Sequence, residues 1–152
     1  MTDIATFDEA PFDITTQAVE ETATIHLKNA DGELLYADTV RKRPVQIVIY
    51  GPGSEAYGLM VSRQSARQAK RYNDNDGRVS PLPFEDHVRE TAEDLAAITR
   101  EFRNFAYPPA TGATGAKLFA AVYADVSLGF IVAQVQKALK DWSAFRKGSG
   151  TS

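Results

Sequence analysis

The stretch that decides the fold is Val45-Gln46-Ile47-Val48-Ile49-Tyr50-Gly51-Pro52-Gly53-Ser54. A short run rich in β-branched residues that ends at glycine and proline is typical of a buried strand. Ser54 is a favourable residue to cap the N-terminus of a helix. The stretch therefore predicts a sheet that ends near residue 50 and a helix that begins at residue 54.

Two more strands are expected before this one. Residues 23–28 alternate apolar and polar side chains, as in a half-buried strand. Asn29-Ala30-Asp31-Gly32 suits a hairpin loop, because Gly32 tolerates a positive φ, and residues 33–37 would form the returning strand. The prediction is an N-terminal three-stranded antiparallel sheet over about residues 22–50.

The remainder of the chain carries helical periodicity. Apolar residues recur every three or four positions from Val88 to Phe105, and again from Leu128 to Trp142. A small sheet with one apolar face needs a cover, so we expect an α+β fold with helices on the sheet. Four helices are predicted, over residues 54–72, 85–106, 116–124 and 127–146.

The chain length fits one domain. The 152 residues are 43% hydrophobic, which favours a folded core. Residues 1–21 contain six acidic side chains and no Lys or Arg, and are expected to form a mobile acidic arm. The predicted organisation is this arm, a single α+β domain over residues 22–147, and a flexible tail over residues 148–152.

Composition argues against most catalytic chemistry. The chain has no cysteine, which excludes disulfides and thiolate sites. His26 and His87 have no metal-site spacing and are expected at the surface. The turn at residues 51–54 lacks the lysine of a phosphate-binding loop, and Glu55 would oppose phosphate. We expect no enzyme activity, cofactor or metal.

One group of carboxylates is a candidate for acid–base chemistry. Its members lie away from the apolar stripe of the second predicted helix, which favours a solvated face. They are Glu90, Glu93, Asp94 and Glu101.

The ends and the charge bear on location. The N-terminus lacks the basic and apolar segments of a secretory signal. The longest apolar run, Leu118 to Ala124, is too short to span a membrane. The net charge of −3 gives no footprint for duplex nucleic acid. We expect an intracellular protein that does not bind a membrane, and the charge gives no support for duplex nucleic acid as its partner.

Two sets of residues are candidate contact surfaces. The first is aromatic, and it serves either the core or a protein partner. Its members are Phe102, Phe105, Tyr107, Phe130, Trp142 and Phe145. The second is a basic stripe that serves as a solvated face, as a contact for phosphate or an acidic partner, or as a dock for the acidic arm. Its members are Arg63, Arg67, Lys70 and Arg71.

Several stretches resemble small proteins encoded in the tail modules of long-tailed phages and prophages. They include residues 44–54 and 95–99, Val122-Tyr123-Ala124-Asp125-Val126-Ser127-Leu128-Gly129-Phe130-Ile131, and Asp141-Trp142-Ser143-Ala144-Phe145. The resemblance covers about residues 22–150. It is greatest to the tail assembly chaperones made just before the tape-measure protein.

The resemblance implies a function without catalytic residues. Such chaperones bind the tape-measure protein in the host bacterial cytoplasm and keep it soluble while tail-tube subunits polymerise around it. In many relatives a frameshifted extension recruits the tail-tube protein. The implied partners are thus the tape-measure protein, the tail-tube protein and further copies of the chain. Two alternatives stay open, namely a neck, tail-terminator or minor tail protein of the virion, and a nucleic-acid-binding or regulatory module.

Overall fold

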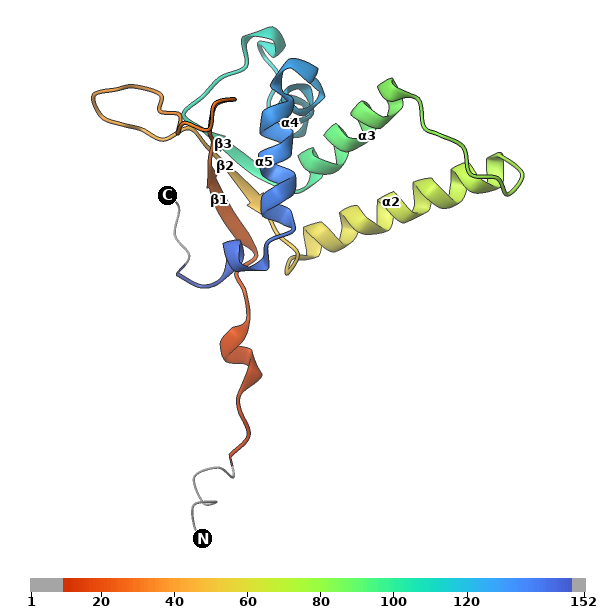
Figure 1. Ribbon diagram of the computed structural model, residues 1–152, viewed down its shortest axis with the longest axis horizontal. Helices are drawn as coiled ribbons and strands as arrows, with labels where there is room; N and C mark the ends of the chain where they lie inside the picture. Colours follow the sequence, from red (N-terminus) through yellow and green to blue (C-terminus); the bar gives the residue numbers. More distant parts are fainter. Residues whose placement is uncertain (1–9, 149–152) are drawn as a thin grey trace.

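The computed structural model describes residues 10–148 and has an α+β architecture (Figure 1). The sheet contains β1 (Thr22–His26), β2 (Gln46–Tyr50) and β3 (Thr99–Arg103), antiparallel and in the order β1-β2-β3. The predicted fold class, a three-stranded antiparallel sheet combined with helices, is confirmed. The third strand, however, comes later in the chain than expected.

The expected returning strand at residues 33–37 makes only isolated bridges, from Lys28 to Leu34 and from Tyr36 to Pro44. The third strand is instead β3, inside the segment for which a helix over 85–106 was predicted. Phe102 fits the helical spacing, yet it lies across from Ile47 in the sheet. Pairing with the open edge of β2 outweighs the local periodicity, because strand formation depends strongly on tertiary context.

The helical elements agree in number with the prediction and differ at their ends. The α-helices are α2 (Glu55–Asp74), α3 (Phe84–Ala97), α4 (Gly115–Ala124) and α5 (Gly129–Leu139). Short 3-10 turns are η1 (Ile14–Gln17), η2 (Pro108–Ala110), η3 (Val126–Leu128) and η4 (Trp142–Phe145). The last predicted helix, 127–146, is therefore divided. The Asp141 carboxylate accepts a hydrogen bond from the Ser143 N–H at 3.0 Å and caps η4 as a separate turn.

The core lies between one face of the sheet and the helices. Ile47 and Ile49 on β2 are fully buried, and they pack in one cluster with Val122 of α4 and Val135 of α5. In Figure 1, α5 passes in front of the sheet. The sheet face that carries Ile47 and Ile49 therefore has the helical cover that a small sheet requires.

Gly51 and Phe145 make the tightest contact in this core. A Cβ on Gly51 would lie 2.2 Å from Cε2 of the Phe145 ring. The ring is 1% exposed, so it has no room to move away. The turn after β2 thus needs glycine because an aromatic ring occupies the space of a side chain.

The N-terminal arm is joined to the body at its last residues. The Glu20 N–H donates to the Phe145 carbonyl at 2.7 Å, and the Gly51 N–H donates to the Glu21 carbonyl at 2.8 Å. Val19 packs against the core. Before Val19, the described part of the arm extends away from the body (Figure 1). Residues 1–9, and the predicted tail beyond Gly148, lie outside the described residues.

The helices of the described chain do not individually meet the requirements of a membrane span. Within residues 10–148, no single helix combines the necessary length and apolar content. Only α4 taken together with residues 126–139 reaches them, as a pair bent by 84°. Both halves of that pair contribute buried residues to the core.

Candidate protein-interaction surface

Helix α2 stands apart from the rest of the fold. It is 20 residues long, yet Met60 is its only buried residue. It packs chiefly on α3 and points away from the sheet (Figure 1). Leu59 and Val61 remain 56% and 39% exposed. Since most helices in proteins are stabilised by burying an apolar face, α2 leaves a large surface for a partner.

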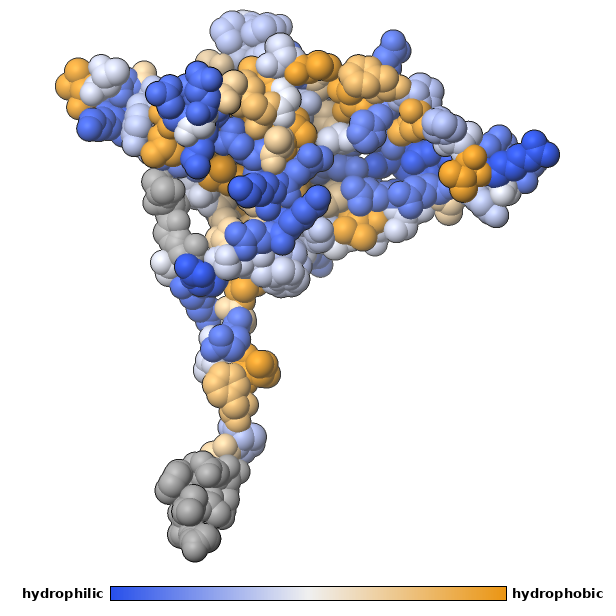
Figure 2. All heavy atoms as spheres, in the orientation of Figure 1, coloured by the Kyte–Doolittle hydropathy of each residue, from blue (hydrophilic) through white to orange (hydrophobic). Residues whose placement is uncertain are grey.

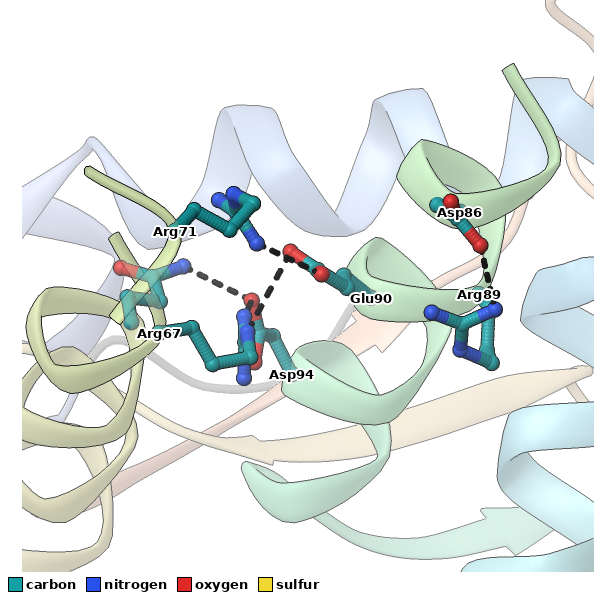
Figure 3. Close-up of polar contacts among 7 residues, drawn as sticks. Arg67, Arg71, Asp86, Arg89, Glu90 and Asp94 are labelled. Carbon is teal, nitrogen blue, oxygen red and sulfur yellow. Dashed lines mark hydrogen bonds and ion pairs between the residues drawn. The ribbon is translucent and has the colours of Figure 1, made fainter. Parts of the chain in front are cut away.

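An ionic cluster joins α2 to α3 (Figure 3). Arg67 Nη2 donates to both carboxylate oxygens of Asp94, at 2.9 and 2.7 Å, and Gln64 donates to the same group at 3.0 Å. Arg71 Nη1 donates to Glu90 Oε2 at 2.8 Å. The Arg67 Nε atom lies 3.2 Å from Glu90 Oε1, so Glu90 faces both arginines.

The cluster is partly removed from solvent. The side chains of Asp94, Glu90 and Arg67 are 9%, 15% and 28% exposed. The hydrogen bond to Asp94 raises the pKa of Arg67, and the negative charges of Asp94 and Glu90 add to that effect. Two arginines thus compensate two carboxylates between the helices. Separating the helices would leave partly buried charges without their partners, so the cluster opposes that separation.

This cluster corrects the expectation that the carboxylates lie on a solvated face. Glu90 and Asp94 point at α2, because α3 packs on α2 as well as on α4. Glu93 is exposed. Glu101 lies on β3, where it pairs with Arg103.

The basic stripe is likewise divided. Arg67 and Arg71 are held by the α3 carboxylates, while Arg63 is exposed. Lys70 pairs with Asp74 at 2.6 Å at the surface. The structure therefore does not bring the four cations together as one open surface.

The aromatic candidates have different surroundings. Phe145 is in the interior, and Phe102 stacks with Phe105 and Phe119 at ring-centroid distances of 4.6 Å. The Tyr107 hydroxyl donates to Asp125 at 2.8 Å. Phe105, Tyr107 and Phe130 are half-buried and pack against the core. Trp142 is different, since it is 57% exposed on η4.

The histidines are also placed differently from each other. His87 is exposed as expected. His26 is buried, with Nε2 2.8 Å from the Leu35 carbonyl oxygen and its ring edge-on to Tyr36 at 4.9 Å. The expectation of a surface histidine is corrected, because the segment around Leu35 folds back over this end of β1. Residues 10–148 contain no group of three His, Asp or Glu side chains placed to hold a metal.

A pocket of about 570 Å³ lies between the second half of α2 and the 75–83 loop. We call it the α2 pocket. Its lining combines apolar and cationic groups, namely Gln68, Arg71, Tyr72, Arg78, Val79 and Leu82. Arg78 pairs with no carboxylate in the described part of the chain. Sequence reasoning missed the pocket because the loop was considered only as a helix break.

Comparison with protein-family models, with curated proteins and with solved structures finds no match.

Proposed function

We propose that this protein is a phage tail assembly chaperone, which binds the tape-measure protein in the host bacterial cytoplasm during tail morphogenesis. The observation that carries the proposal is α2, a 20-residue helix with one buried residue, whose second half extends away from the core. The resemblance at residues 122–131 and 141–145 supports the same assignment.

The outer side of α2 suits a helical client. Exposed residues follow a spacing of three and four on the side opposite the ionic cluster. They are Leu59, Ser62, Ala66, Ala69 and Asn73, of which the last two also line the α2 pocket. Small side chains allow a second helix to approach closely, and Leu59 supplies an apolar anchor. The helix is about 30 Å long at 1.5 Å per residue, so it can contact several turns of a client.

Binding at one such surface is expected to be weak. A long client offers many similar helical segments, and copies bound along it gain from multivalency. The flanking charges, Arg63 and Lys70, keep the free helix soluble. This combination suits a chaperone that must leave its client when the tail tube assembles.

The basic stripe gives less support to the nucleic-acid alternative. Arg67 and Arg71 already bind carboxylates of α3, so contacting phosphate would require breaking those pairs. The alternative of a neck, tail-terminator or minor tail protein predicts that the chain is present in purified virions.

The test is co-expression with the tape-measure protein that the proposal places in the next gene. We expect a larger soluble fraction of the tape-measure protein with the wild-type chain, and a smaller one with Leu59→Glu or Ala66→Glu. Val40→Glu is the matched control, since Val40 is 89% exposed in the loop before β2. Circular dichroism verifies that each variant is folded.

Two results would contradict the proposal. One is an insoluble tape-measure protein despite abundant wild-type chain. The other is a high copy number in purified virions by mass spectrometry, which would favour the neck, tail-terminator or minor tail alternative.

A further inference from the structure

The described part of the N-terminal arm before Val19 carries apolar side chains without a pocket of its own. We call residues 10–18 the projecting arm. Phe12 and Ile14 are 70% and 71% exposed. Asp13 lies between them and caps η1, accepting hydrogen bonds from the Thr15 N–H and hydroxyl. These hydrogen bonds lower the pKa of Asp13, which keeps its carboxylate charged.

The α2 pocket has the complementary chemistry. Tyr72 and Val79 are 51% and 90% exposed and give it an apolar wall. Arg78 gives it a cation that no described carboxylate neutralises. A ligand that fits must offer an apolar side chain next to a negative charge. The sequence Phe12-Asp13-Ile14 has this composition. Asp3, Asp8 and Glu9 precede the projecting arm in the sequence and add negative charge to the N-terminal segment.

We infer that copies of this protein associate by placing the projecting arm of one copy in the α2 pocket of the next. Phe12 and Ile14 cover Tyr72 and Val79, and the Asp13 carboxylate faces the Arg78 guanidinium. The inference concerns the protein without any client, so it stands independently of the proposed function.

The arm that enters the α2 pocket comes from a second copy, because the arm of the same copy extends away from its own pocket. Its base is fixed beside Gly51 by the hydrogen bonds of Glu20 and Glu21. From there the described arm runs away from the body, and α2 runs in another direction (Figures 1 and 2). The donor and acceptor surfaces are thus different parts of the chain. Each contact therefore joins two unlike surfaces, and repeating it builds either a closed ring or an open chain of copies.

Heterologous contacts permit a complementation experiment. The arm variant is Phe12→Ser/Ile14→Ser, and the pocket variant is Arg78→Glu. Both change exposed positions, so both should fold. Val40→Ser and Arg63→Glu are matched controls, because they change an exposed apolar side chain and an exposed arginine outside both surfaces. Sedimentation velocity of the full chain, without client, measures the average mass against concentration.

We expect the mass of the wild-type chain to rise with concentration and to fall with added salt, because salt screens the Asp13–Arg78 attraction. Each variant alone should associate at least about tenfold more weakly, and both controls should match the wild type. An equimolar mixture of the two variants should form a one-to-one complex, since one retains the pocket and the other retains the arm. A monomeric wild type at every concentration, or a mixture that stays monomeric, would overturn the inference.

Discussion

At the scale of single residues, the turn after β2 has no room for a side chain, because the buried Phe145 ring lies where a Cβ on Gly51 would stand.

Gly51 provides a test at this scale. Gly51→Ala should lower the free energy of unfolding by about 1–3 kcal/mol, because the new methyl group overlaps the buried ring of Phe145. Urea denaturation measures the change.

Gly58→Ala is the matched control. Gly58 lies within α2 with nothing within 4 Å of an added Cβ, so alanine there should stabilise by about 0.5–1 kcal/mol. Equal effects at the two glycines would show that the Phe145 ring does not lie against Gly51.

Other single residues show what the sequence predicts and what it does not. Ser54 caps α2 as predicted, and its hydroxyl accepts a hydrogen bond from the Tyr57 N–H at 3.2 Å. The sequence places His26, Glu90 and Asp94 at the surface, because each lies off the main apolar pattern of its element. In each case a second element packs on that polar side, and the pattern of a single element does not contain this information.

At the scale of secondary structure, the sequence predicts which segments form helices and strands better than it predicts which strands pair. The strands around residues 25 and 48 and the helices that begin near residues 54 and 116 form close to the expected bounds. The third strand was misplaced because residues 99–103 satisfy helical spacing and because their partner, β2, lies about fifty residues earlier. The loop at residues 29–32 indicated instead that residues 33–37 would pair with the strand before it, but that segment forms only isolated bridges.

The attachment of α2 should be visible in its dynamics. Amides of residues 62–74 should exchange with deuterium faster than those of α4, because this part of α2 has no fully buried residue. Asp94→Ala should accelerate the exchange further, by roughly tenfold, since it leaves Arg67 without its main partner.

The control is Asp86→Ala, which removes an exposed pair with Arg89 on the outer side of α3 and should leave α2 unchanged (Figure 3). Slow exchange throughout α2 in both variants would mean that the helix does not depend on the ionic cluster.

At the scale of the whole molecule, the projecting arm contributes much less than the body to the free energy of unfolding. Deleting residues 1–18 from a dilute sample should change the free energy of unfolding by less than about 0.5 kcal/mol, because no described residue of that segment is buried. Deleting residues 1–21 should cost about 1–2 kcal/mol, since the Glu20 and Glu21 hydrogen bonds and the Val19 contact are lost.

Chemical denaturation of the two truncated chains, at a concentration where the wild type is monomeric, measures both values. A large loss with the shorter deletion would show that the projecting arm belongs to the fold of its own copy.

The late position of β3 and of Phe145 has a consequence for synthesis. A ribosome makes β1 and β2 first, yet β3 follows about fifty residues later, and the ring that fills the turn at Gly51 follows later still. Until α4 and α5 have been made, Ile47 and Ile49 have no cover. Since domains generally fold as units, β1 and β2 must stay uncovered in the nascent chain through most of its translation.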